Sequence, residues 1–309
     1  MKILVTGGAG FIGSHLCEML VTKGNFVIAV DINTLDKKEL TTYDSFLFYQ
    51  IDVNDTAKLE YIFCNNQIDM VYHLASNTSI PKGQMNVNID LNNTFRTTLS
   101  VLELLVKYKI KKFVYTSSST VYGDCQEPCT ESNAHLLPIS YYGAAKLASE
   151  AFISAYSSLF NVQTWVFRLC NVIGEYAKHG VIYDIFQQIK SGNTMLHLLG
   201  DGLQEKPFLY IDDFLDGMQY VIKNTKERYN IYLIGNDTTI SLHTIVNILC
   251  KEMNRNIDVS WSNENCTWPG DVKRYRYNIE KVTSLGWKYQ YDSAEAVVKT
   301  IQNILKLYK

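Results

Sequence analysis

Short apolar runs alternate with helical patterns of apolar residues along the first half of the chain. Ile3, Leu4 and Val5 form an unbroken apolar run, typical of a strand covered on both faces, and helical spacing follows over 11–20. Further predicted strands lie at 26–31, 46–53, 70–74 and 112–118, and predicted helices lie at 56–65, 92–109 and 142–160. Strands that alternate with helices in this way predict an α/β fold with a doubly wound parallel sheet.

The second half predicts more helix than strand. Helical patterns cover 183–190, 213–223, 241–254 and 293–307, and Ser241 is a capping residue for the third of them. A strand is predicted at 229–235. We therefore expect a Rossmann-type nucleotide-binding domain at 1–172 and a smaller C-terminal substrate-binding lobe at 173–309. Part of 207–235, including 207–212, is expected to return to the Rossmann sheet.

Glycines fill the turn between the first strand and the first helix. Gly7 suits a tight turn, Gly10 lets the backbone approach a pyrophosphate, and Gly13 allows close packing of the helix on the strand. The phosphates would then face a helix N-terminus, which favours negative charge. The alternative is a purely structural turn, but the order of strand, glycines and helix favours a dinucleotide site.

The second predicted strand ends at Asp31, about 20 residues after the glycines, where a carboxylate accepts hydrogen bonds from a ribose diol. Such a carboxylate repels a 2′-phosphate, so NAD is favoured over NADP. Asp52, at the end of the third strand, is a candidate for the adenine amino group, and Ala75 and Ser76 follow the fourth strand. The residues expected at the cofactor are Gly7, Gly10, Phe11, Ile12, Gly13, Asp31, Asn33, Asp52, Val53, Leu74, Ala75 and Ser76, together with Tyr142 and Lys146.

Composition excludes several classes of protein. The chain has 309 residues, 47% of them hydrophobic, a formal charge of −2 and a pI near 6.3, so it has no electrostatic footprint for nucleic acid. No apolar run reaches the length of about 18 residues that a membrane span needs. Because the first strand starts at Met1–Lys2, we expect no signal peptide and a cytoplasmic protein. The seven cysteines suit reduced thiols, and no metal site is expected.

Hydroxyl groups and a tyrosine–lysine pair indicate the chemistry. The segment 116–123, TSSSTVYG, follows the strand at 112–118, and Tyr142 and Lys146 lie one helical turn apart. A phenol with a pKa near 10 is a poor base at neutral pH, and a neighbouring ammonium favours the phenolate. An exposed i,i+4 pair is the alternative when the pair is taken alone. His73 suits a buried core position better than a catalytic one.

Together these motifs resemble the extended short-chain dehydrogenases/reductases, specifically the NAD-dependent nucleotide-sugar epimerases and dehydratases. The resemblance covers essentially the whole chain: TGGAGFIG at 6–13, HLAS at 73–76, TSSSTVYG at 116–123, YGAAK at 142–146, RLCNVIG at 168–174, GDGLQEK at 200–206 and LYIDD at 209–213. It implies that Ser118 is the catalytic hydroxyl, Tyr142 the acid/base and Lys146 the residue that binds the nicotinamide ribose. It also implies that Asn171 contacts the pyrophosphate side of a sugar nucleotide.

Local differences separate the activities of this family. Dehydratases and decarboxylases carry an acidic residue just after the catalytic hydroxyl, whereas this chain has Ser119 and Thr120. The pattern most resembles UDP-glucose 4-epimerases and implies a nucleoside diphosphate sugar, with a UDP-hexose favoured. Substrate contacts are expected at Ser118, Ser119, Asn171, Lys206 and Arg274.

Some of the phosphate contacts of the family differ here. Lys206 replaces an expected arginine, and a second arginine position falls at Thr267 or Trp268. Lysine is a point charge rather than a bidentate fork, so the nucleotide stays open. Two alternatives also stay open: a 4-ketoreductase or dehydrogenase that exchanges NAD(P)H, and a catalytically silent NAD-binding regulator. The resemblance further implies a homodimer.

Overall fold

The computed structural model describes residues 1–262 and 272–308. They divide into two compact units that do not follow a single cut in the chain. The first unit consists of residues 1–123, 135–168 and 224–232, and the second of 124–134, 169–223 and the described residues from 233 onward. The expected division into a nucleotide-binding domain at 1–172 and a substrate-binding lobe at 173–309 refers to the ligands that each part binds, and it stays a prediction.

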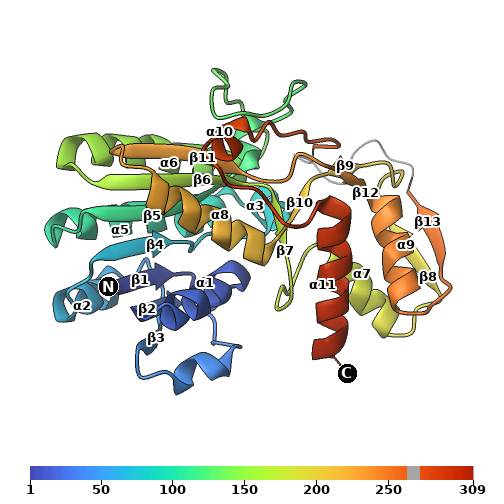
Figure 1. Ribbon diagram of the computed structural model, residues 1–309, viewed down its shortest axis with the longest axis horizontal. Helices are drawn as coiled ribbons and strands as arrows, with labels where there is room; N and C mark the ends of the chain where they lie inside the picture. Colours follow the sequence, from blue (N-terminus) through green and yellow to red (C-terminus); the bar gives the residue numbers. More distant parts are fainter. Residues whose placement is uncertain (263–271, 309) are drawn as a thin grey trace. The chain divides into compact units, whose positions relative to one another are not determined.

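A seven-stranded sheet organises the first unit (Figure 1). The order is β11-β6-β5-β4-β1-β2-β3, and β1 pairs in parallel with both β2 and β4. The pairs β2–β3 and β4–β5 are also parallel. The strands are β1 (Lys2–Thr6), β2 (Phe26–Asp31), β3 (Phe46–Gln50), β4 (Met70–His73), β5 (Lys112–Ser118), β6 (Gln163–Leu169) and β11 (Tyr229–Ile234).

Helices cover both faces of this sheet, which confirms the doubly wound α/β prediction. Leu4, Val71 and Phe113 share a core with side chains of α2 (Thr56–Asn65), α5 (Thr97–Lys107) and α6 (Tyr141–Phe160). No residue of α1 (Phe11–Thr22) belongs to this cluster, although α1 contacts β1 and β2, so α1 covers the other face (Figure 1). Short helices complete the unit: η1 (Lys38–Thr42), α3 (Ile80–Met85), α4 (Val87–Asp90), η2 (Leu91–Arg96) and η3 (Ser119–Tyr122).

The predicted helix at 92–109 is interrupted. Its first turns form the π-helical segment η2, and α5 begins only at Thr97. Thr97 and Thr98 donate their hydroxyls to carbonyls of the preceding turn, for example Thr98 Oγ1 to Thr94 O at 2.7 Å. The spacing of apolar residues predicted one continuous α-helix here and did not indicate the π turn.

The second unit has small sheets and helices. Its elements are β7 (Asn171–Ile173), α7 (Val181–Lys190), β8 (Met195–Leu198), β9 (Glu205–Lys206), β10 (Phe208–Tyr210), α8 (Ile211–Asn224), β12 (Ile240–Ser241), α9 (Leu242–Glu252), β13 (Asp258–Trp261), α10 (Glu280–Ser284) and α11 (Ser293–Leu307). The expectation that 207–212 joins the Rossmann sheet is wrong, because β10 pairs with β7 in a separate two-stranded sheet. The segment that joins it is β11, next to β6.

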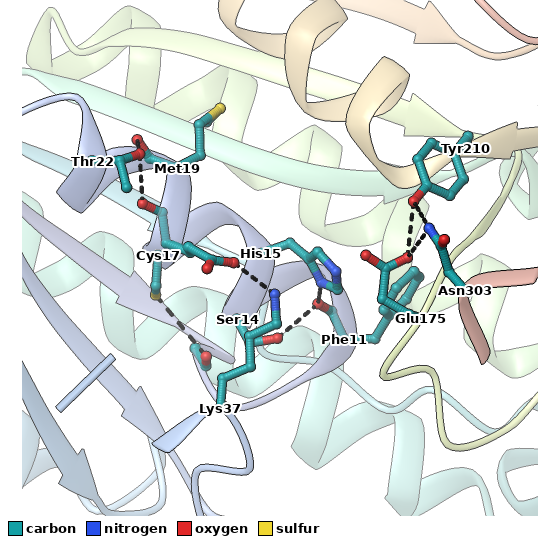
Figure 2. Close-up of polar contacts among 12 residues, drawn as sticks. Phe11, Ser14, His15, Cys17, Met19, Thr22, Lys37, Glu175, Tyr210 and Asn303 are labelled. Carbon is teal, nitrogen blue, oxygen red and sulfur yellow. Dashed lines mark hydrogen bonds and ion pairs between the residues drawn. The ribbon is translucent and has the colours of Figure 1, made fainter. Parts of the chain in front are cut away.

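Two polar features secure helices of the second unit. Ser241 Oγ accepts a hydrogen bond from Thr244 N at 3.2 Å, which confirms the predicted cap of α9. Asn303 of α11 donates to Tyr210 Oη at 2.9 Å, and that hydroxyl donates to Glu175 Oε2 at 2.9 Å (Figure 2). Among the described residues, no helix is long and apolar enough to span a membrane.

Candidate active site

Gly7 and Gly13, at the two ends of the loop between β1 and α1, have no room for a side chain. Gly7 has a φ of +74°, and a Cβ on it would lie 2.8 Å from Ala75 N. A Cβ on Gly13 would lie 2.0 Å from Gly7 O. The loop therefore presents backbone, followed directly by the first turn of α1, whose amides lack intrahelical partners. This arrangement fits the pyrophosphate of a dinucleotide.

The first turn of α1 is held by its own polar side chains (Figure 2). Ser14 Oγ donates to Phe11 O at 3.1 Å, and His15 Nδ1 lies 2.9 Å from the same carbonyl. Gly10 is the N-cap, and its carbonyl accepts from Ser14 N at 2.9 Å. Phe11, Ile12 and Gly13 thus form the first turn of the helix, and their contact with the cofactor stays a prediction.

Asp31 stands at the end of β2 and contacts the glycine loop. Its Oδ2 accepts from Ala9 N at 3.1 Å, and its Oδ1 accepts from Asn33 N at 2.9 Å. Asn33 Nδ2 also donates to Oδ1 at 3.2 Å, so one of the about four acceptor sites of the carboxylate is left for a ribose hydroxyl. The residues present fit the adenosine end of NAD. Asp52 lies beyond β3, where its Oδ1 accepts from Asn54 N at 2.8 Å, and Val53 follows it in the core.

The fourth strand ends beside the same loop. Leu74 N donates to Thr6 O at 3.0 Å, and Ala75 N lies 3.3 Å from Thr6 Oγ1. His73 is fully buried between Thr6 Oγ1 at 2.7 Å and Thr98 Oγ1 at 3.1 Å. It therefore occupies the core position that its sequence context favours.

The structure brings Tyr142, Lys146 and Ser118 together. Lys146 is 1% exposed, and its Nζ donates to Thr116 O at 2.7 Å on β5. The same ammonium lies 5.7 Å from the ring centroid of Tyr142 and 4.9 Å from that of Tyr115. Burial raises the pKa of Tyr142, while the neighbouring hydroxyls of Ser118 and Ser76 act in the opposite direction. The hydroxyl strand and the tyrosine–lysine helix thus form one site at the carboxyl edge of the sheet.

The acidity of Tyr142 differs from the expectation for an ion-paired phenolate. Burial raises the pKa of Tyr142 to about 12, and the nearby carboxylate of Asp90 acts in the same direction. Burial also lowers the pKa of Lys146 to about 7, although Glu150 and Asp90 partly counteract this. In the protein alone Tyr142 is therefore a neutral phenol near pH 7, and proton removal from it requires additional positive charge.

Ser118 and Ser119 occupy the turn after β5. Ser118 is the N-cap of η3, and its Oγ accepts from Thr120 N at 3.2 Å and from Thr120 Oγ1 at 2.9 Å. Accepting two hydrogen bonds leaves the hydroxyl proton of Ser118 able to be donated. Ser119 is buried in the first turn of η3.

The predicted nucleotide contacts lie in the second unit. Asn171 Nδ2 donates to Pro207 O at 3.3 Å. Lys206 is in β9, and Arg274 Nε lies 3.9 Å from Oε2 of the adjacent Glu205, with its side chain 60% exposed. The structure therefore places Lys206 and Arg274 near one another. Lys273 pairs with Asp201 at 2.6 Å, and Thr267 and Trp268 lie outside the described residues.

Sequence reasoning missed a group of buried charges near Tyr142 and Lys146. Glu150 pairs with Arg168 at 2.7 Å, and Asp90 accepts from Asn77 Nδ2 at 2.7 Å. Burial raises the pKa of Asp90. The helical spacing of Glu150, one turn after Lys146, was the available signal, but a charge at such a position is exposed in most helices.

A nucleotide cradle on β1–α1, an acid at the end of β2 and a serine–tyrosine–lysine set define a nicotinamide-dependent enzyme of the short-chain dehydrogenase/reductase type. The chain belongs to the NAD dependent epimerase/dehydratase family, whose model matches residues 3–235.

Similar proteins agree with this assignment. A putative UDP-glucose 4-epimerase of Methanocaldococcus jannaschii is 29% identical over 97% of each chain. A crystal structure of a UDP-galactose 4-epimerase is 31% identical and covers all of both chains with a TM-score of 0.89. The UDP-glucuronic acid 4-epimerase of Bacillus cereus, solved with UDP-glucuronic acid and NAD, is 27% identical over all of both chains with a TM-score of 0.88.

Proposed function

We propose that this protein is an NAD-dependent 4-epimerase of a nucleoside diphosphate hexose, with a UDP-hexose as substrate. The observation that carries this proposal is the meeting of Ser118, Tyr142 and Lys146 at the strand edge next to the glycine loop. The similar UDP-galactose 4-epimerase and UDP-glucuronic acid 4-epimerase structures support the nucleotide and the reaction.

Ser118, Tyr142 and Lys146 have separate roles in the proposed reaction. Ser118 donates a hydrogen bond to the oxygen on C4 of the sugar, and the ionised form of Tyr142 takes the proton from that hydroxyl. Lys146 supplies positive charge beside the phenol. The chemistry that NAD supplies when bound is reversible acceptance of a hydride from C4. Return of that hydride to the opposite face of the 4-keto sugar would invert C4, and Tyr142 returns the proton to the C4 oxygen.

Epimerisation is favoured over dehydration by the turn after the catalytic hydroxyl. Elimination of water needs a second acid/base group. In this turn Ser119 and Thr120 carry only hydroxyl groups, which are poor acids and bases near neutral pH. Thr120 is moreover engaged with Ser118 at 2.9 Å. Asn171, Lys206 and Arg274 stay predicted contacts of the nucleotide.

The acid/base role of Tyr142 is tested by Tyr142→Phe, with Tyr141→Phe as the matched control. Tyr141 precedes it on α6 but is 47% exposed. Loss of a general acid/base lowers kcat by about 10²–10⁴-fold. We expect this loss for Tyr142→Phe and wild-type turnover for Tyr141→Phe. Equal turnover of the two variants would refute the role of Tyr142.

The reaction is tested with the purified protein and no added cofactor. After denaturation the supernatant is assayed for NAD(H), and the native protein is incubated with UDP-glucose while NMR follows UDP-galactose. Bound NAD with product formation supports the epimerase. Turnover of a 4-keto nucleotide sugar only with added NADH or NADPH would assign a reductase instead. Bound NAD with no conversion of any nucleotide sugar would point to a silent regulator.

We also propose that the protein forms a homodimer through the outer face of α6. Phe152, Leu159 and Phe160 are 45%, 75% and 39% exposed on this helix. Phe152 packs edge to face on Phe95 of η2, with ring centroids 5.1 Å apart. Large exposed apolar side chains that gather on one helix are typical of protein–protein interfaces.

A further inference from the structure

A buried ion pair lies behind the catalytic set. Arg168 of β6 contacts Glu150 of α6 through two parallel hydrogen bonds, Nη2 to Oε2 at 2.7 Å and Nε to Oε1 at 3.1 Å. The two side chains are 4% and 5% exposed. Burying a charge pair costs about as much desolvation energy as the attraction returns, so stability alone is a weak reason for this pair.

The pair reaches both ends of the segment that carries Ser118. Ser117 Oγ donates to Glu150 Oε1 at 2.5 Å, and Ser117 immediately precedes the catalytic serine. At the other end, Arg168 Nη1 donates to Tyr122 Oη at 3.2 Å, and Tyr122 closes η3. Its guanidinium also lies 5.0 Å from the Tyr122 ring centroid.

Glu150 also belongs to the helix that carries the other catalytic groups. Tyr142, Lys146 and Glu150 follow one another at intervals of four residues and therefore share one face of α6. Through Glu150, this helix is tied to the residue before Ser118, and through Arg168 to the residue that ends the turn after it. The charge of Glu150 additionally favours the ammonium form of Lys146.

We propose that Glu150 and Arg168 are a positioning pair, which holds Ser118 at a fixed distance from Tyr142 and Lys146 by joining 117–122 to α6. Neither residue touches the reacting atoms in this proposal. The kinetic test of this proposal rests on the proposed epimerase function, whereas a second test, by amide hydrogen exchange, does not.

Direct removal of the pair is a poor test, because Glu150→Gln leaves a buried guanidinium without its counter-ion and threatens folding. Ser117→Ala removes one hydrogen bond to the pair and leaves the pair itself intact. Its matched control is Ser157→Ala. Ser157 is a buried serine of the same helix, and its hydroxyl donates to Val162 O at 2.8 Å. It lies 15 residues after Tyr142, or about 22 Å along the helix.

For Ser117→Ala we expect kcat to fall by about 10- to 100-fold, the range that follows displacement of a catalytic group by a fraction of an ångström to one ångström. KM and the amount of bound NAD should match those of Ser157→Ala, because Ser117 contacts neither ligand in the proposal. Tyr122→Phe, which loses the bond to Arg168, should lower kcat in the same direction. Equal kcat for Ser117→Ala and Ser157→Ala would overturn the proposal.

Amide hydrogen exchange supplies the test that needs no substrate. Exchange over 117–122 should be faster in Ser117→Ala than in the wild type and unchanged in Ser157→Ala. Unchanged exchange in both variants would contradict the positioning role. If the wild type converts no UDP-hexose, the proposed function fails, and the exchange measurement still decides whether the pair holds this segment.

Discussion

At the scale of single residues, the buried imidazole of His73 makes the stability of the fold depend on pH. It lies between two threonine hydroxyls beneath the carboxyl end of β4, and burial together with the charge of Lys146 lowers its pKa to about 3. The folded protein therefore keeps His73 neutral, whereas the unfolded chain protonates it below about pH 6.5.

This difference predicts acid sensitivity of folding. As the pH falls below about 6.5 toward 3, the unfolded state binds one more proton than the folded state, so the free energy of unfolding decreases by up to ~1.4 kcal/mol per pH unit. His73→Gln should reduce this slope between pH 6.5 and 5, measured by urea unfolding. His197→Gln, at an exposed position, is the control and should keep the wild-type slope. Parallel pH profiles for the wild type and His73→Gln would contradict the prediction.

Asp31 predicts the choice of cofactor. Asp31→Ala removes the carboxylate that accepts from Ala9 N and that would oppose a 2′-phosphate. We expect weaker NAD binding and a smaller ratio of NAD to NADP affinity, measured by fluorescence titration. Asp44→Ala, which removes an exposed carboxylate of the loop before β3, should leave the ratio unchanged. A preserved preference for NAD in Asp31→Ala would refute the ribose assignment.

Residues that carry the family motifs were the easier part of the candidate site to predict. Ser118, Tyr142 and Lys146 were expected together; Lys146 contacts Thr116, on the strand of Ser118, and lies beside the Tyr142 ring, while their catalytic roles stay predictions. The pair of Glu150 and Arg168 was not expected, because the two residues are 18 positions apart in the sequence and meet only through the packing of α6 on the sheet. The raised pKa of Tyr142 also depends on burial, which spacing does not report.

At the scale of elements, the start of α11 shows a complete capping box. Asp292 Oδ1 accepts from Glu295 N at 2.8 Å, and Glu295 Oε2 accepts from Asp292 N at 2.9 Å. Asp292→Ala should lower the free energy of unfolding by about 1 kcal/mol. Asp292→Asn keeps a good cap acceptor and should lose less, measured by chemical denaturation. Equal losses in the two variants would show that the cap hydrogen bond does not matter.

Local pattern predicted most elements but not their interruptions. The predicted helices at 56–65 and 293–307 match α2 and α11, and the strand at 112–118 matches β5. The π segment η2 was missed because apolar spacing predicted one continuous α-helix over 92–109.

At the scale of the molecule, strand pairing is where pattern alone was insufficient. Alternation of strands and helices predicted the doubly wound sheet, because parallel strands need crossover helices. Within 207–235, the expected return to the sheet is made by 229–234 and not by 207–212, although both are short apolar segments. Pairing of β10 with β7 brings together two segments that are far apart in the sequence, and the apolar pattern of either segment alone does not predict its partner.

The proposed homodimer gives the prediction for the assembled protein. Phe152→Glu places a charge on the outer face of α6 beside the ring of Phe95, and burying that charge in an interface costs several kcal/mol per ion. We expect the variant to be monomeric by sedimentation at concentrations where the wild type is dimeric. Leu203→Glu introduces the same charge at a side chain of the second unit that is 57% exposed, and it should leave the assembly unchanged. A monomeric wild type would refute the homodimer, and a dimeric Phe152→Glu protein would place the interface elsewhere than on α6.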